Sequence, residues 1–153
     1  MKIDLTKEQY ENLVKIVYLG NWVVNAIRTG AEGDERIEKY EDTEQYIFSF
    51  YKDFGLEKYI EYDKEFKEFF PTSELEDNSD TRGYLEDYDN EAFWDELGDR
   101  LGDRDFFRKY TEEEIKAMDQ KERFLTNQKS IIKYEEEFEK YGIDRLELGV
   151  NNH

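Results

Sequence analysis

The side chains that could do chemistry in this chain are mainly carboxylates, because it has no cysteine and its single histidine is the last residue, His153. Thiol catalysis, cysteine-ligated zinc and disulfides are therefore excluded, and so is a histidine-based triad or metal cluster. The 40 Asp and Glu residues outnumber the 22 Lys and Arg residues, which gives a formal net charge of -18. Among so many carboxylates, spacing alone selects no acid–base pair. The sequence therefore indicates no catalytic residue, no metal and no cofactor, and it favours a protein that is not an enzyme.

Three aspartates recur at every fourth position in one stretch of the sequence. Asp95, Asp99 and Asp103 are spaced i, i+4 and i+8, which places their carboxylates along one side of a helix. Such a row could bind a divalent cation or a basic partner. The alternative is a solvated helix face, on which neighbouring arginines such as Arg100 offset the repulsion between like charges.

A second polar row lies within an otherwise apolar segment. Asn21, Asn25 and Arg28 are spaced i, i+4 and i+7 among valine, leucine and isoleucine residues. Buried amides need hydrogen-bond partners, so this row could form a structural network or face a ligand pocket. If it faced the three aspartates, a polar pocket between the N-terminal helix and the helix at residues 91–109 could serve a small-ligand or metal-dependent enzyme.

The negative charge is concentrated in the middle of the chain. Residues 61–90 contain 11 acidic and 3 basic side chains, a net charge of -8, and aromatic residues alternate with the carboxylates. Such a surface repels the phosphates of nucleic acids and membranes, and it speeds association with a basic protein. Tyrosine rings could add contacts to arginine. The residues expected to bind a partner are Glu74, Glu76, Asp77, Asp80, Tyr84, Glu86, Asp87 and Tyr88.

These features favour a small acidic protein-binding module that docks on a basic surface of a partner protein, as inhibitors, immunity proteins and nucleic-acid mimics do. The first alternative is the enzyme with the pocket described above, and the second is a structural homo-oligomer without catalysis. The acidic charge could also serve solubility alone. We expect no direct nucleic-acid binding and no membrane binding, and the sequence leaves the oligomeric state open.

The start of the chain and its longest apolar run both argue against export and membrane insertion. Residues 1–5 lack the basic, apolar and small-residue parts of a signal peptide. The run Leu13–Ile27 is too short to span a bilayer and contains Lys15. Together with the lack of cysteine, these features lead us to expect a cytoplasmic protein.

The run Leu13–Ile27 also organises the predicted fold. Its apolar positions cover every face of a 3.6-residue helix, so we expect this helix to be buried on most sides. The pattern Thr6–Gln9 is a capping box, which predicts that the helix begins near Lys7. A second capping box begins at Thr111 and predicts another helix start.

The rest of the chain is also mostly helical in pattern. Gly98 and Gly102, one turn apart, predict the close approach of another helix, with Gly20 as a candidate contact. Residues 72–82 are polar and are predicted to form a loop. Apolar spacing predicts a helix within 34–54, one or two short helices at 56–70, a helix at 91–109, and helical structure over 111–141 with a break near 126–127.

The sequence therefore predicts a mainly α fold. We expect one compact domain of residues 1–153, with about five to seven helices around a buried N-terminal helix. A chain of 153 residues is long enough to bury a core without disulfides or metals. The extended-looking ends, residues 2–5 and 143–148, could pair as a two-stranded ribbon that joins the termini.

Overall fold

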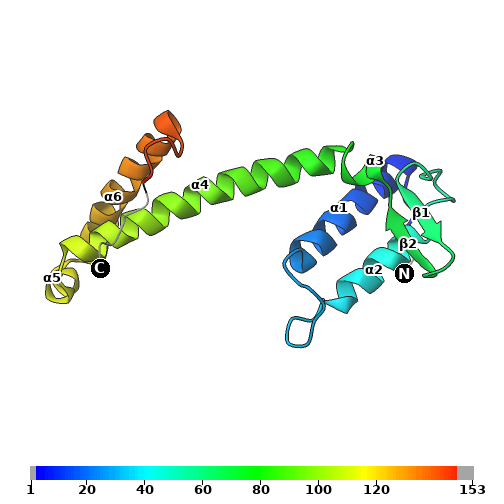
Figure 1. The fold of residues 1–153 in the computed structure, drawn as a ribbon, viewed down its shortest axis with the longest axis horizontal. Coiled ribbons are helices and arrows are strands. Elements are labelled where there is room, and N and C mark those ends of the chain that lie inside the picture. Colours follow the sequence, from blue (N-terminus) through cyan, green and yellow to red (C-terminus); the bar gives the residue numbers. More distant parts are fainter. Residues whose placement is uncertain (1–2, 148–153) are drawn as a thin grey trace. The chain divides into compact units, whose positions relative to one another are not determined.

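The computed structural model of the chain describes residues 3–147 (Figure 1). The described residues are mainly helical, so the predicted mainly α fold is confirmed. They form two compact units, residues 1–85 and 86–153, and α4 begins in the first and ends in the second. The prediction of a single domain stays a prediction. The elements are α1 (Lys7–Asn25), α2 (Glu38–Phe48), β1 (Ile60–Asp63), β2 (Glu68–Pro71), α3 (Ser73–Glu76), α4 (Asp80–Lys109), α5 (Glu112–Ala117) and α6 (Gln120–Tyr141).

Helix α1 begins where its capping box predicts. The backbone N–H of Gln9 donates to the Thr6 hydroxyl at 3.2 Å, and the backbone N–H of Thr6 donates to the Gln9 side chain at 2.9 Å. These bonds satisfy donors that a helix start otherwise leaves unpaired. The second capping box has the same geometry, with Thr111 before α5 and Glu114 closing it.

Helix α1 is buried on one face only, so the prediction of a helix buried on most sides is wrong. Tyr10 and Val14 are 2% and 0% exposed, whereas Ile16 and Val23 are 65% and 56% exposed. Within the first unit α1 lies beside α2, and the two strands pack at one end of this pair (Figure 1). Packing against one neighbouring helix covers only one stripe of a helix, so apolar residues on its other faces stay exposed.

The core of the first unit is built from aromatic and aliphatic side chains of α1, α2, β1, α3 and the segment after α2. Tyr10 stacks on Phe54 with ring centroids 4.1 Å apart, and its hydroxyl donates to the Ile47 carbonyl at 2.5 Å. Burial and the nearby charge of Asp53 raise the pKa of Tyr10 to about 12, so this hydroxyl remains a donor. The buried members of the core are Tyr10, Val14, Phe48, Tyr51, Leu56, Tyr59, Ile60 and Leu75.

Residues 56–70 contain turns and most of a β-hairpin, so the short helices predicted there are wrong. β1 and β2 pair antiparallel, with Tyr62 opposite Phe69. The alternation of apolar and charged residues from Ile60 to Asp63 has the period of a strand, but the many aromatic residues nearby also fit a helical spacing. Gln45 joins the hairpin to α2, because its side chain both donates to the Phe69 carbonyl and accepts from the Phe69 N–H, each at 2.8 Å.

The two-stranded sheet lies inside the first unit and does not join the termini. Residues 3–5 and 143–147 form no strand, and residues 2 and 148 of the predicted ribbon lie outside the described residues. The segment after α6 instead forms turns, in which the N–H of Asp144 donates to the Tyr141 carbonyl and the N–H of Leu146 to the Ile143 carbonyl. These local bonds compete with pairing of a short strand.

In the second unit α6 runs back along α4, and a glycine lets the two helices meet. A Cβ placed on Gly102 would lie 2.5 Å from Cγ1 of Ile131 and 2.8 Å from its Cα, whereas a Cβ on Gly98 would meet Glu135 at 3.7 Å. The close approach predicted at this glycine pair is therefore confirmed. The neighbour of Gly102 is Ile131 of α6, and the predicted contact with Gly20 stays a prediction.

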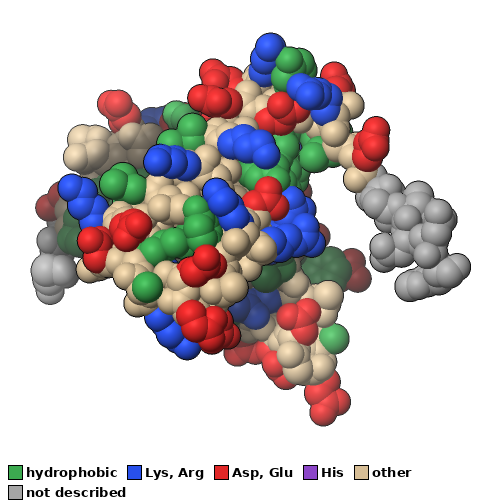
Figure 2. All heavy atoms as spheres, turned by 90° about the vertical axis from the view of Figure 1, so that its left-hand side faces the viewer, with side chains coloured by type: hydrophobic (Ala, Val, Ile, Leu, Met, Phe, Trp, Pro, Cys, Tyr) green, Lys and Arg blue, Asp and Glu red, His purple; other side chains and the backbone are tan. Residues whose placement is uncertain are grey.

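The core of the second unit is smaller than that of the first. Among the described residues its buried apolar side chains are Phe106, Ile131 and Phe138, which are 1%, 6% and 7% exposed. Acidic, basic and hydrophobic side chains are interspersed over the face shown in Figure 2. None of the helices within residues 3–147 is long and apolar enough to cross a membrane.

Two helices extend through positions where the sequence predicted a helix start or a break. α4 begins at Asp80 and not near residue 91, and α6 passes without a break through residues 126–127. Part of the predicted loop at 72–82 is the short helix α3. Near residues 126–127 α6 contacts α4, where Nδ2 of Asn127 donates to Asp103 at 2.7 Å.

Candidate functional site

The acidic residues predicted to bind a partner come from α3, the turn after it and the first turns of α4. Glu74 and Glu76 lie in α3, and Asp77 follows it. The remaining residues lie on α4, where Asp80, Tyr84 and Tyr88 share one face because they are spaced four apart; the others there are Glu86 and Asp87. We call residues Glu74, Glu76, Asp77, Asp80, Tyr84, Glu86, Asp87 and Tyr88 the acidic surface.

Two fully buried side chains anchor the N-terminal part of this surface to the first unit. Leu75 and Thr81 are both 0% exposed, although each lies next to exposed carboxylates. The hydroxyls of Ser79 and Thr81 both donate to the Leu75 carbonyl, at 2.6 and 3.0 Å. The backbone from α3 into α4 is therefore fixed, and it presents its charged residues outward.

Asp80 of the acidic surface is engaged with a lysine of α1. Nζ of Lys15 lies 2.9 Å from Oδ1 of Asp80, and Lys15 also lies 3.5 Å from Glu11. The hydrogen bond to Lys15 lowers the pKa of Asp80, and the same bond raises the pKa of Lys15. Asp80 therefore helps to fix the start of α4.

The tyrosines of the acidic surface are open to solvent. Tyr84 is 59% exposed and Tyr88 is 68% exposed, and all the carboxylates of the surface are exposed as well. Partial burial, reinforced by the neighbouring charge of Asp77, raises the pKa of Glu76. Rings and carboxylates that are both accessible can contact the aliphatic stem and the charged head of a lysine or arginine.

Two of the three polar residues predicted on α1 form a buried hydrogen-bond chain. Nδ2 of Asn25 donates to Asn21 at 2.8 Å, and Nδ2 of Asn21 donates to Glu44 of α2 at 2.9 Å. The other end of the chain accepts at 2.8 Å from the N–H of Ile37, just before α2. Asn21, Asn25 and Glu44 are 8%, 1% and 9% exposed. Both amides thus have hydrogen-bond partners within the first unit, as expected if this polar row forms a structural network and does not face a ligand pocket.

Glu44 is the chemically unusual member of this buried chain. Burial raises its pKa to about 7, although the hydrogen bond from Asn21 opposes the shift; Glu41 adds to the shift and Arg36 reduces it. The charge of Glu44 also helps to raise the pKa of Tyr18, after the larger effect of burial. Glu44 is therefore partly protonated near neutral pH.

The remaining residues of the predicted polar pocket have separate local roles. Nε of Arg28 donates to the Val24 carbonyl, one turn earlier, at 2.9 Å. In the second unit Asp103 accepts from Asn127, Asp99 is exposed, and Asp95 lines a hollow next to α6. A pocket shared by these aspartates and the α1 residues stays a prediction. Within residues 3–147 no group of acidic side chains is placed to hold a metal ion.

Sequence reasoning missed Glu44, which ends the buried chain, and Lys15, which pairs with Asp80 of the acidic surface. Glu44 is one of 40 acidic residues, and nothing in its sequence neighbourhood distinguishes it from solvated carboxylates. Lys15 offered a weak signal, because a charged residue in an apolar helical run needs a partner or an exposed position. Its partner is 65 positions further along the chain, a distance that periodicity does not bridge.

No protein-family model, curated protein or solved structure matches the chain.

Proposed function

We propose that this chain is a small acidic protein-binding module that docks on a basic surface of a partner protein, in the manner of an inhibitor, an immunity protein or a nucleic-acid mimic. The observation that carries the proposal is the acidic surface, where exposed carboxylates and exposed tyrosines follow one another from α3 into α4. Carboxylates on a fixed backbone can occupy positions that phosphates would otherwise take on the partner.

The charge of the molecule supports a protein partner over a nucleic acid or a membrane. The net charge of -18 repels phosphates, and it attracts basic surfaces over distances of about 10 Å at moderate salt. Binding should therefore be fast at low salt and should weaken as salt screens the charges. We place the module in the cytoplasm, without direct binding to nucleic acid or membranes.

The contacts and exposure of each carboxylate decide which residues are suitable for substitution. Asp80 is already paired with Lys15, so its neutralisation would disturb the start of α4 as well as any docking. Glu74, Asp77 and Asp87 are exposed and are better probes. Three exposed carboxylates of the second unit, Glu113, Glu122 and Asp144, make a matched control with the same change in net charge.

The test begins with capture of partners from a lysate of the source cells at low salt, followed by elution at moderate salt. The affinity of the purified partner is then measured for Glu74→Gln/Asp77→Asn/Asp87→Asn and for the control Glu113→Gln/Glu122→Gln/Asp144→Asn. We expect at least a tenfold loss for the first set, since exposed charge pairs contribute about 0.2–1 kcal/mol each and tyrosine contacts depend on them. The control should lose less than threefold. Equal losses in the two sets would refute a localised docking surface.

A further inference from the structure

A hollow of about 500 Å³ lies between α4 and α6 in the second unit, outside the acidic surface. Its walls combine two aromatic rings with four carboxylates, and among residues 3–147 no basic side chain lines it. The lining residues are Glu91, Trp94, Asp95, Glu135, Phe138 and Glu139. This combination differs from a plain acidic helix face, because the half-buried ring of Trp94 gives a ligand a surface on which to stack.

The rings of the hollow are held in place. The centroids of Trp94 and Phe138 lie 5.4 Å apart with the planes tilted by 41°, and Phe138 is 7% exposed. Nε1 of Trp94 donates to Asn90 one turn earlier at 3.2 Å. The indole N–H is therefore occupied, and the half-buried Trp94 ring, which also meets Phe93 edge to face, can offer a ligand only its ring surface. Elsewhere in residues 3–147, the lysines and arginines that lie over rings lie over tyrosines.

The carboxylates of the hollow stand in two pairs on facing helices. Glu91 and Asp95 are four residues apart on α4, and Glu135 and Glu139 are four residues apart on α6. Like charges at this spacing repel one another in the free protein. A bound cation would relieve that repulsion. The described carboxylates do not converge closely enough to hold a metal ion, which favours a larger organic cation.

We propose that this hollow binds an arginine side chain of a basic polypeptide. A guanidinium can stack on the Trp94 face while its edge donates to carboxylates on both helices, and its delocalised charge is more weakly hydrated than an ammonium. Because the lining is negatively charged and arginine is positively charged, we take the occupant of the hollow to be a basic peptide. The hollow is a contact separate from the acidic surface, so it can exist whether or not that surface docks a partner.

Trp94 provides a direct readout of the hollow. The chain has two tryptophans, and Trp22 is 40% exposed, so Trp22→Phe leaves Trp94 as the only indole without opening the core. We would titrate this variant with hexa-arginine and with hexa-lysine, and follow both Trp94 fluorescence and the heat of binding. We expect saturable quenching by hexa-arginine, with at least threefold weaker binding of hexa-lysine.

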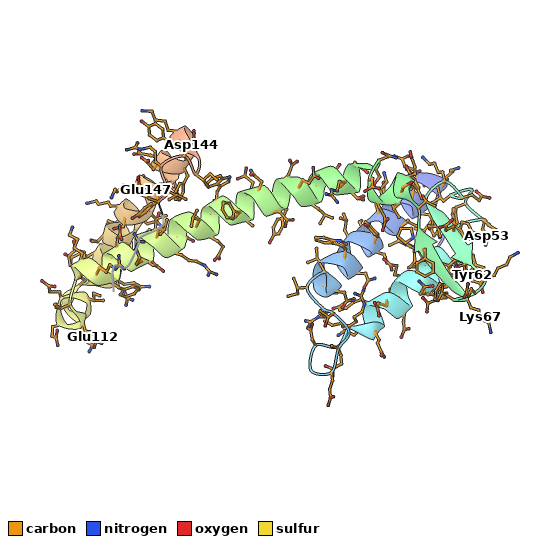
Figure 3. All side chains as sticks on the ribbon, in the orientation of Figure 1. Asp53, Tyr62, Lys67, Glu112, Asp144 and Glu147 are labelled. Atoms are coloured by element: carbon orange, nitrogen blue, oxygen red, sulfur yellow. The ribbon has the colours of Figure 1, made fainter. Side chains whose placement is uncertain are left out.

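A matched pair of variants then separates the hollow from general charge. Glu91→Gln/Asp95→Asn/Glu135→Gln/Glu139→Gln, made in the Trp22→Phe background, should weaken the quenching by hexa-arginine at least tenfold. The control Glu112→Gln/Glu113→Gln/Glu122→Gln/Asp144→Asn changes the net charge equally at exposed positions, of which Figure 3 shows Glu112 on α5 and Asp144 after α6. It should change the quenching less than threefold. Circular dichroism checks that both variants keep their helices.

Two outcomes would overturn the proposal. One is equal weakening by the two sets of substitutions, which would mean that peptide binding follows net charge alone. The other is peptide binding, seen as heat, that leaves Trp94 fluorescence unchanged. The variant Glu74→Gln/Asp77→Asn/Asp87→Asn, also in the Trp22→Phe background, should keep the quenching, so a failure of the acidic surface and a failure of this hollow are told apart.

Discussion

The first unit buries a continuous cluster of aromatic and aliphatic side chains around Phe48, whereas the second unit joins two helices along a glycine contact and buries few large side chains. In the first unit, contacts between residues far apart in sequence, such as Gln45 with Phe69, connect helices to a hairpin. In the second, Gly102 brings α4 and α6 close enough for backbone contact with Ile131. The first unit is thus held together by large side chains that fill its core, and the second by two helices that pack closely at a glycine.

Truncating a large buried ring tests the first half of this comparison and should have the largest effect. Phe48 is 0% exposed, so Phe48→Ala should cost about 3–5 kcal/mol of unfolding free energy, because it removes buried apolar area and leaves a cavity. Hydrogen exchange read by mass spectrometry should show the loss of protection in residues 1–85. The matched change Phe106→Ala should reduce protection in residues 86–153. If either change lowered protection equally throughout the chain, the contrast between the units would be wrong.

Adding one methyl group at a glycine of α4 tests the second half of the comparison, the close approach of α4 and α6. Gly102→Ala should destabilise the protein by about 2–3 kcal/mol, because the new Cβ would overlap Ile131 and its backbone. Gly98→Ala should be neutral or stabilising by up to about 1 kcal/mol, because its Cβ has room at 3.7 Å and alanine favours the helix. Urea denaturation of both variants measures the difference. If the Gly102→Ala variant were as stable as the Gly98→Ala variant, α6 would not approach Gly102 closely.

The buried chain that ends at Glu44 gives the first unit a dependence on pH. The pKa of Glu44 is raised in the folded state, so its favourable contribution is complete below about pH 4.5 and is lost as the pH rises through about 7. We expect Glu44→Gln to gain about 2 kcal/mol in stability relative to the unsubstituted protein between pH 5.5 and pH 8, since glutamine can still accept from Asn21 without a charge.

Thermal unfolding at several pH values, compared with the exposed control Glu38→Gln on the same helix, measures this gain. The control should follow the unsubstituted protein across the range. If the difference between Glu44→Gln and the unsubstituted protein were independent of pH, Glu44 would have an ordinary pKa and the buried chain would be only a packing feature.

Features fixed by neighbouring residues were predictable from the sequence. The capping boxes at Thr6 and Thr111 mark real helix starts, because a cap depends on side chains three positions apart. The glycine pair also predicted a close helix approach, because a missing Cβ permits one wherever a partner helix is present. The acidic segment at 61–90 is a property of composition alone.

The helix boundaries and the hairpin were harder to predict, because aromatic residues fit two periods at once. Residues 60–71 carry rings that match a helical spacing as well as the alternation of a strand, and pairing with Gln45 and the core decides for the strand. The burial on most sides predicted for α1 fails because apolar residues on several faces need neighbours on several sides, and within the first unit α2 packs along one side of α1.

The sequence by itself determined the mainly helical character, two helix starts and the concentration of negative charge, because each rests on residue type and short-range spacing. Only the tertiary structure decided that α6 meets Gly102, that Lys15 pairs with Asp80, and that Glu44 is the carboxylate buried against Asn21. These choices depend on which surfaces meet after folding, and one of 40 acidic residues acquires a shifted pKa only when its neighbours exclude water from it.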